Sequence, residues 1–263
     1  NAIPTLAKAG DVVTASFTSA DPVTAATIGG HAATVVRGAG NNYTASYTVQ
    51  AGDIGAAGVS ITATDAAGNA TVQTMAATVT MDTTIPGAPI ITTTSRTITS
   101  SSYTIAGTAE ANSTVSVYDG ATLLGSTPVN SIGSFTYTLT GLSQTTHAIT
   151  AKSTDATGNV SPASTALTLA VDTTAPMVTA VTDGVVSNVT KDQITYAVTF
   201  GEALASDPTT ANFTATNATV TWVNKVDSTH YTVVVTPDAN VASGTVALSL
   251  VGGSLKDAAG NSV

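Results

Sequence analysis

The sequence predicts an all-β protein, and three observations support this fold class. About one residue in five is threonine, and β-branched residues favour pleated strands over helices. Apolar and polar residues alternate with a period of two along most of the chain. The 22 glycines and 9 prolines interrupt these segments every few residues, as turns between short strands do. No stretch shows the apolar period of an amphipathic helix, about 3.6 residues.

Alternation also locates individual strands, each with one apolar face directed toward a core. Turn sequences such as Gly29-Gly30 and Asp119-Gly120 separate neighbouring strands. The expected strands cover residues 13–17, 43–49 and 59–63, then 103–105, 115–117, 135–139 and 167–171, then 194–200, 231–235 and 246–250. Because aromatic residues make up only 5% of the chain, each core is expected to be thin and aliphatic.

Two short patterns recur and divide the chain into three repeats. Asp-x-x-Gly-Asn occurs at 65–69, 155–159 and 257–261, and Asp-Thr-Thr-x-Pro occurs at 82–86 and 172–176. Equivalent positions lie 90 or 102 residues apart, which is the size of one immunoglobulin-like sandwich. Because proline cannot continue a central strand, each Asp-Thr-Thr-x-Pro segment is predicted to be a short, stiff linker. We expect three tandem immunoglobulin-like domains, at residues 1–82, 83–172 and 173–263, arranged as an extended rod.

Both ends of the chain lack a part of the repeat. No Asp-Thr-Thr-x-Pro linker precedes the first repeat, and the sequence stops at Val263, before the strand that ends the other two repeats. Such a chain is expected to be a piece cut from a longer array. Alternatively, a neighbouring copy donates the missing strand, which would build a filament by strand addition.

Acidic residues recur at three positions that a β-sandwich brings to one end. One lies in the linker, one follows the second strand, and one lies in the loop before the last strand. Because successive strands alternate in direction, these segments return to the end at which the chain enters the domain. The residues are Asp82, Glu110 and Asp155 at the first junction, Asp172, Glu202 and Asp257 at the second, and Asp21 and Asp65 in the first repeat, whose linker acid would lie before residue 1.

Three carboxylates in one place repel one another unless a cation joins them. Oxygen ligands favour a hard cation, and Ca²⁺ fits better than Mg²⁺, which demands stricter octahedral geometry. The side chains of Asn159 and Asn261, backbone carbonyls and water could complete the usual ligand number of about six to eight. The alternative is that these Asp and Asn residues only form turns by bonding their own backbone. The sequence thus predicts Ca²⁺ as a cofactor at the domain junctions.

Composition and charge exclude several classes of function. With Lys+Arg 7 against Asp+Glu 16, and a net charge of -9, the chain has no basic stripe that could follow a nucleic-acid backbone. The absence of cysteine excludes disulfides, thiolate metal sites and cysteine nucleophiles. No apolar run approaches the length of about 18 residues that a membrane span needs, so no direct membrane insertion is expected.

Catalysis is not expected either. The sequence has no Gly-x-Ser-x-Gly elbow and no phosphate-binding glycine loop. Glu110 and Asp155 could form a glycosidase pair, but a catalytic pair is seldom copied into every repeat. His31, His147 and His230 lie in three different repeats and are expected to be hydrogen-bonded or solvated side chains. Trp222 alternates with Val220, which favours a core or half-buried position over a sugar-stacking platform.

The segments that carry the acids resemble a known family. Gly107–Glu110, Ala151–Asn159 and Val171–Pro176 together are similar to the bacterial Ig-like (Big) repeats of large repetitive surface adhesins and biofilm-associated proteins. The first repeat, from Gly10 to Tyr47, resembles a sister repeat, and Val198–Ala203 resembles another, although Gly201 stands where Ser or Thr is more usual. The resemblance implies long, calcium-rigidified stalks exported from Gram-negative bacteria. Most repeats of such proteins are spacers, and adhesion belongs to specialised terminal domains.

The expected function is therefore a non-enzymatic extender or stalk segment, located outside the cell at a bacterial surface. Its partners are expected to be neighbouring repeats of the same polypeptide. Any glycan or host-protein ligand is expected elsewhere in the parent protein. Two alternatives stay open: an adhesive module that binds a glycan or a host protein, and a self-assembling filament or surface-layer subunit.

Overall fold

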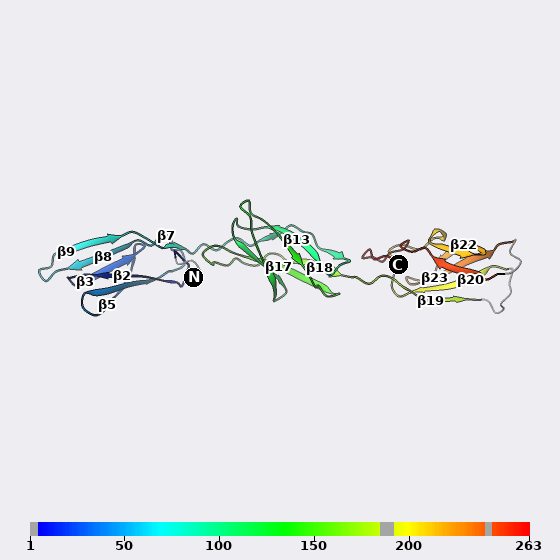
Figure 1. Ribbon diagram of the computed structural model, residues 1–263, viewed down its shortest axis with the longest axis horizontal. Helices are drawn as coiled ribbons and strands as arrows, with labels where there is room; N and C mark the ends of the chain where they lie inside the picture. The colour runs from blue at the N-terminus through cyan, green and yellow to red at the C-terminus, as the bar shows by residue number, and fades with distance from the viewer. Residues whose placement is uncertain (1–4, 185–191, 240–243) are drawn as a thin grey trace. The chain divides into compact units, whose positions relative to one another are not determined.

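A computed structural model of the chain describes residues 5–184, 192–239 and 244–263. Within these ranges the regular structure consists of β-strands and one short 3-10 helix, η1 (Thr210–Asn212), as Figure 1 shows. The predicted all-β fold class is confirmed. In the same ranges, no helix has the length and apolar character needed to cross a membrane.

Strands β1 to β10 belong to the first repeat and form three sheets, in the orders β1-β10-β7, β2-β6-β5 and β4-β3-β8-β9. The strands are β1 (Leu6–Ala7), β2 (Val12–Thr18), β3 (Val23–Ile28), β4 (His31–Ala32), β5 (Thr34–Arg37), β6 (Asn42–Thr48), β7 (Ile54–Ala56), β8 (Val59–Thr64), β9 (Ala70–Met75) and β10 (Thr80–Asp82). β1 runs parallel to β10, with Ala7 opposite Met81. Ile28, Ala45 and Met81 lie at the centre of an aliphatic core, as the low aromatic content predicts.

Strands β11 to β18 belong to the middle repeat. They are β11 (Ile90–Ile91), β12 (Arg96–Ile98), β13 (Tyr103–Thr108), β14 (Thr114–Asp119), β15 (Thr122–Pro128), β16 (Ser134–Leu139), β17 (Thr146–Thr154) and β18 (Leu167–Val171). β14 pairs in antiparallel fashion with both β15 and β17, and β11 pairs with β13. β12 runs parallel to β18, with Ile98 opposite Val171. This pairing repeats the parallel pairing of β1 with β10.

Strands β19 to β24 belong to the third repeat. They are β19 (Val178–Asp183), β20 (Ile194–Phe200), β21 (Phe213–Thr216), β22 (Ala218–Lys225), β23 (His230–Pro237) and β24 (Ala247–Leu250). One sheet has the order β19-β20-β23-β22, and β21 pairs with β24. The core between these strands contains Tyr196, Phe200, Phe213 and Tyr231, so the expectation of an aliphatic core was wrong for this repeat, into which a large share of the few aromatic residues is concentrated. Phe200 and Tyr231 meet edge to face, with ring centroids 5.9 Å apart.

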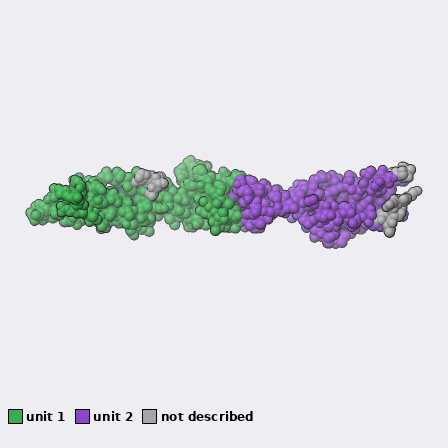
Figure 2. Space-filling view, turned by 60° about the horizontal axis from the view of Figure 1, so that its bottom comes forward, with its two compact units in different colours: residues 1–94, 104–138, 148–167 green, residues 95–103, 139–147, 168–263 purple. Residues whose placement is uncertain are grey.

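The described residues separate into two compact units, which Figure 2 shows in different colours. Unit 1 consists of residues 1–94, 104–138 and 148–167, and unit 2 of residues 95–103, 139–147 and 168–263. The division passes through the middle repeat, so the three domains expected at 1–82, 83–172 and 173–263 stay a prediction. The acidic residues of the first junction all belong to unit 1, and those of the second junction all belong to unit 2.

The ten strands expected from alternation are all present, with ends that differ by a few residues. The prediction for Trp222 was wrong, because 56% of its surface is exposed. The pairing of β22 with β23 shifts between Val220 and Trp222, as at a β-bulge. Such a shift adds one residue to the strand and reverses which side chains face the core. Val220 and Val223 are accordingly half-buried while Trp222 faces outward.

Gly107 of β13 is buried at a place where the backbone and an aromatic ring leave no room for a side chain. A Cβ atom added there would lie 2.5 Å from the Ile90 carbonyl oxygen and 2.5 Å from Cζ of Phe135. We expect Gly107→Ala to lower the free energy of unfolding of the middle repeat by about 1–3 kcal/mol, as overpacking does. Differential scanning calorimetry measures the effect. Gly87→Ala, at a position with open space around it, is the control that should leave the transition unchanged.

Candidate metal centre at the domain junctions

The three Asp-x-x-Gly-Asn segments fold into the same loop. In the loop of the third repeat, Oδ1 of Asp257 accepts hydrogen bonds from the backbone N–H groups of Gly260 (2.6 Å) and Asn261 (2.9 Å). Oδ2 of Asp257 accepts a third bond, from Nδ2 of Asn261, at 2.8 Å. The glycine has φ +91°, +93° and +105° in the three copies, a region that suits glycine and strains other residues. The pattern therefore specifies a turn that is closed by hydrogen bonds between its own residues.

The asparagine of the loop also holds the linker. Nδ2 of Asn159 donates to the backbone carbonyl of Asp82, and Nδ2 of Asn261 donates to that of Asp172, both at 2.9 Å. Each of these nitrogens also bonds the aspartate of its own loop. The sequence predicted both asparagines as oxygen ligands of a metal. In the structure each amide nitrogen donates to the carboxylate of its own loop and to the backbone carbonyl of the linker aspartate. Each asparagine therefore ties the linker to the loop of the following repeat.

The linkers are also anchored to the preceding repeat. The hydroxyl of Thr83 donates to the carbonyl of Asp53 at 3.2 Å and accepts the N–H of Gly52 at 2.9 Å. At the second junction, the hydroxyl of Thr173 donates to Oε1 of Gln144 at 2.9 Å, and Gln144 also donates to Thr174. Each linker is thus hydrogen-bonded to residues on both sides of it, and its stiffness stays a prediction.

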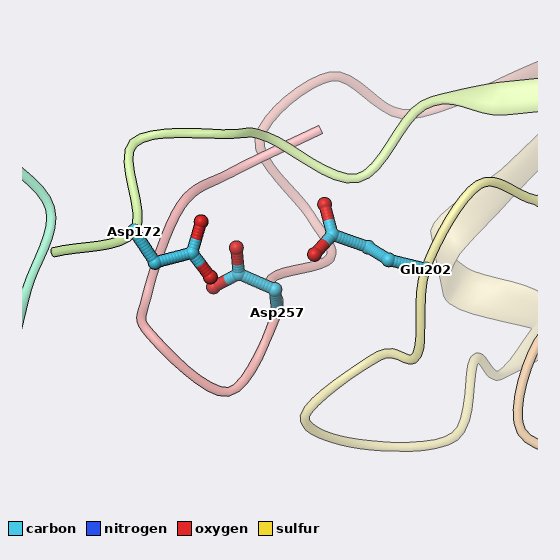
Figure 3. Close-up of side chains that lie close together, drawn as sticks. All are labelled: Asp172, Glu202 and Asp257. Carbon is cyan, nitrogen blue, oxygen red and sulfur yellow. The ribbon is translucent and has the colours of Figure 1, made fainter. Parts of the chain in front are cut away.

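The structure gathers the three acids of the second junction. One carboxylate oxygen from each of Asp172, Glu202 and Asp257 lies within 4.8 Å of the others. Figure 3 shows the three carboxylates directed toward a common point. Asp172 follows β18, Glu202 follows β20, and the Asp257 loop is held beside the Glu202 segment by the N–H of Ala205, which donates to the Lys256 carbonyl at 2.8 Å. Asp257 is buried, with 3% of its surface exposed, and the other two are half-buried.

The pKa values of two carboxyl groups in this cluster are shifted in opposite directions. Burial, together with the charges of Asp257 and Asp172, raises the pKa of Glu202. Burial also acts to raise the pKa of Asp257, but the hydrogen bonds from Asn261 and Gly260 outweigh it and hold that pKa below its usual value. The raised pKa of Glu202 thus reflects its burial and the two acidic neighbours that share the cluster.

The acids of the first junction are arranged differently. Among the described residues, Asp82, Glu110 and Asp155 do not form a group as close as the one at the second junction. Glu110 is exposed, whereas its counterpart Glu202 is half-buried. In the first repeat, the N–H of Thr64 donates to the Pro22 carbonyl, which brings the exposed Asp21 segment beside the Asp65 loop. The metal-ligand roles of these five acids stay predictions.

A basic residue that the sequence reasoning missed lies at the first junction. Nζ of Lys8 donates a hydrogen bond of 2.9 Å to the carbonyl of Gly158, inside the Asp155–Asn159 loop. Lys8 is one of only seven Lys and Arg residues in the chain, and this scarcity was the one feature of the sequence that could have drawn attention to it. Nothing in the sequence around residue 8 indicates that its side chain reaches a loop 150 positions away.

The second junction also carries a pocket of about 600 Å³. Asp172 and Glu202 line it, together with other residues from the segments 144–146, 170–179 and 201–202. All donor atoms that the three acids offer are carboxylate oxygens, the ligand type that Ca²⁺ prefers. A cation bound among the three carboxylates would offset their mutual repulsion. The residues present at the second junction thus fit a hard divalent cation.

The three histidines are hydrogen-bonded, as predicted. His147 is buried and its Nε2 lies 2.9 Å from the Ser143 carbonyl oxygen. His31 lies 3.2 Å from the buried Asp53, and His230 lies 2.9 Å from Asp227. The acid partners of His31 and His230 were not foreseen from the sequence.

Two segments of the chain match known families. Residues 88–170 match the family described as bacterial Ig domain, and residues 172–263 match the family described as bacterial Ig-like domain. The junction that gathers Asp172, Glu202 and Asp257 lies where the first matched segment ends and the second begins. No curated protein sequence matches the chain.

Several solved structures are similar to this chain at low identity and low TM-score. The fibronectin(III)-like modules of Clostridium thermocellum CbhA are 17% identical with a TM-score of 0.37, covering 64% of this chain and 88% of that chain. FdeC, an Escherichia coli adhesin, is 13% identical with a TM-score of 0.36, covering 98% and 91%. The BSP domain of a biofilm-associated protein is 17% identical with a TM-score of 0.27, covering 64% and 29%. These likenesses concern the fold alone.

Proposed function

We propose that the chain, whose residues 88–170 and 172–263 match a bacterial Ig domain family and a bacterial Ig-like domain family, is a non-enzymatic extender segment of a surface adhesin, stiffened by calcium at a domain junction. The observation that carries the proposal is the convergence of Asp172, Glu202 and Asp257, one from the linker and two from the following repeat. A cation bound by all three would tie the linker to two loops of that repeat. The joint would then lose freedom to bend, and successive domains would hold one direction.

The existing hydrogen bonds prepare the junction for this role. Asn261 already ties the Asp172 carbonyl to the Asp257 loop, and Gln144 anchors the linker to the preceding repeat. Glu202 lies on a segment separate from both of these anchors, and its carboxylate lies close to those of Asp172 and Asp257. Bound Ca²⁺ would supply positive charge at this point and would be coordinated by the carboxylate oxygens. The expected change is therefore concentrated in the position of Glu202 relative to the linker.

The proposed location is outside the cell, at a bacterial surface. Extracellular calcium modules bind at about 10⁻⁴–10⁻³ M, so a site of this kind is filled outside the cell and empty in the cytosol. An extended, stiffened segment would hold an adhesive domain of the parent protein away from the membrane. The neighbouring repeats of the same chain are its partners in this proposal.

Small-angle X-ray scattering of the whole chain with calcium and with a chelator tests the stiffening. We expect a larger maximum dimension and a narrower distribution of distances with calcium. Glu202→Gln should abolish this difference, while Glu110→Gln, at the exposed counterpart of the first junction, should preserve it. Identical scattering of the unmodified chain in both conditions would show that the linkers are stiff without metal and would refute the proposal.

Glu202→Gln also has an expected effect on stability that changes sign with calcium. The raised pKa of Glu202 means that the folded state holds its proton more tightly than the unfolded state. Without calcium, this carboxyl favours folding below its unfolded pKa and disfavours it as pH rises through the folded pKa. At pH 7 the variant should therefore be more stable than the unmodified chain, by less than about 1 kcal/mol for a half-exposed charge.

With calcium at about ten times its Kd, the unmodified chain should gain about 1.4 kcal/mol and become the more stable of the two. Trp222 is the only tryptophan, so its fluorescence during urea unfolding reports on the third repeat alone. Glu110→Gln should show the unmodified behaviour in both buffers. An equal gain from calcium in Glu202→Gln would show that Glu202 takes no part in binding.

A further inference from the structure

Strand register identifies one pair of equivalent residues at the two junctions. In the parallel pair of β1 and β10, Ala7 is opposite Met81, so the next residues, Lys8 and Asp82, follow at the same level. In the parallel pair of β12 and β18, Ile98 is opposite Val171, and the next residues are Thr99 and Asp172. Lys8 and Thr99 therefore occupy one structural position, each beside the linker aspartate of its junction.

Both residues face the glycine of the following Asp-x-x-Gly-Asn loop. Nζ of Lys8 donates to the Gly158 carbonyl, and a Cβ atom added to Gly158 would lie 3.3 Å from the same Nζ. A Cβ atom added to Gly260 would lie 4.0 Å from Cγ2 of Thr99. The position is therefore in contact with the loop in one junction and close to it in the other. Only at the first junction does the side chain bring a positive charge.

The backbone at Lys8 is itself held in place. The N–H of Lys8 donates to Oδ2 of Asp11 at 3.0 Å, and the N–H of Asp11 donates back to the Lys8 carbonyl at 3.0 Å. The side chain is half-buried, whereas Thr99 is exposed. A half-buried ammonium on a fixed backbone loses less entropy on bonding than a free surface lysine does. The contact between Lys8 and Gly158 is therefore better held in place than one made by an exposed lysine on a free loop.

We propose that Lys8 is a built-in cation that locks the first junction, and that the residue at this position decides whether a junction needs a free metal ion. The Lys8 bond to Gly158 and the Asn159 bond to the Asp82 carbonyl cross the first junction in opposite directions. Together they join the first repeat to the loop that carries Asp155. At the second junction Asn261 makes the corresponding bond, but the uncharged Thr99 brings no cation to the three gathered acids.

The inference rests on the proposed function for its second half, the metal requirement of the second junction. Its first half, the lock by Lys8, stands on the contacts of the first junction alone. An ammonium held against the Asp155–Asn159 loop also opposes a second cation there by charge repulsion. The two junctions should therefore differ in calcium response although their acids recur at the same sequence positions.

The test exchanges the two residues and reads each junction separately. Because the chain has no cysteine, pairs of introduced cysteines can carry spin labels without background. Ile54→Cys with Ile132→Cys brackets the first junction, and Ser101→Cys with Val226→Cys brackets the second, all at exposed positions. Double electron–electron resonance then gives the width of the distance distribution, with 5 mM calcium (about tenfold above a weak extracellular Kd) or with a chelator.

In the unmodified chain, the first junction should give a narrow distribution in both buffers, and the second only with calcium. Lys8→Thr should broaden the first junction in chelator, and calcium should narrow it again. Thr99→Lys should make the second junction narrow without calcium. Lys8→Met keeps the aliphatic stem and should behave as Lys8→Thr does, because charge and not packing forms the lock; Lys8→Arg should retain the narrow distribution.

The outcomes separate this inference from the proposed function. If the second junction responds to calcium but Lys8→Thr leaves the first junction narrow in chelator, the Lys8 lock is wrong and the calcium proposal stands. If neither unmodified junction responds to calcium but Lys8→Thr broadens the first, the calcium proposal fails and the lock stands. A first junction that broadens in chelator with Lys8 in place overturns the inference.

Discussion

Replacing Phe200 by alanine is expected to lower the free energy of unfolding of the third repeat by about 3–5 kcal/mol, the usual cost of removing a buried phenylalanine. The ring has 2% of its surface exposed and packs edge to face on Tyr231 at 5.9 Å between centroids. The core around it, which also holds Tyr196 and Phe213, can relax only partly into the resulting cavity, so the cavity adds to the cost. Since Phe200 ends β20 two residues before Glu202, the variant should also weaken calcium binding at the second junction.

Fluorescence of Trp222 during urea unfolding measures this loss without interference from the other repeats. Phe17→Ala in β2, where the ring is half-buried in the first repeat, provides the matched control. If the repeats unfold independently, the control leaves the Trp222 transition in place. A loss below about 1 kcal/mol in Phe200→Ala would mean that the core of the third repeat closes around the gap.

Alternation located strands well wherever large apolar residues mark one face. It missed β17, although β17 is the longest strand, because its inward face presents His147, Ile149, Ala151 and Ser153. Small and polar residues on a buried face do not produce a hydrophobic period. It also misplaced Trp222, since a bulge reverses alternation and cannot be seen in composition. These failures have the same cause: burial depends on which element covers a face, and periodicity reports only which face is apolar.

The junction acids could be found from sequence because they recur in register with the repeat. The difference between the junctions could not, since it depends on where a long side chain ends. Lys8 and Gly158 are 150 residues apart, and their contact follows from the parallel pairing of β1 with β10 and from the linker path. The roles of Asn159 and Asn261 were similarly hidden, because an amide offers both an oxygen and a nitrogen, and only the surroundings decide which one faces the acids.

Replacing Asp257 by alanine is expected to destabilise the third repeat by about 2–4 kcal/mol, since it removes three hydrogen bonds to a charged group, and one such bond contributes about 1.5–3 kcal/mol. The carboxylate accepts two backbone bonds and one from Asn261, and only 3% of the residue is exposed. Because hydrogen bonds lower its pKa below 3.8, this contribution is present above pH 3.8 and is lost as pH falls through the folded pKa. The stability difference between the variant and the unmodified chain should therefore shrink in acid.

The measurement is again Trp222 fluorescence, in chelator, so that any loss of metal binding does not contribute. Asp207→Ala is the control, because Asp207 pairs with Lys225 at 2.7 Å where both side chains are about half exposed, and such pairs contribute less than about 1 kcal/mol. A loss in Asp257→Ala no larger than in Asp207→Ala would show that the loop finds water for its donors. The Asp-x-x-Gly-Asn pattern would then serve only to place its aspartate at the junction. A large loss would instead show that one carboxylate both closes the turn and faces the linker, so that folding of the third repeat prepares the second junction before any metal binds.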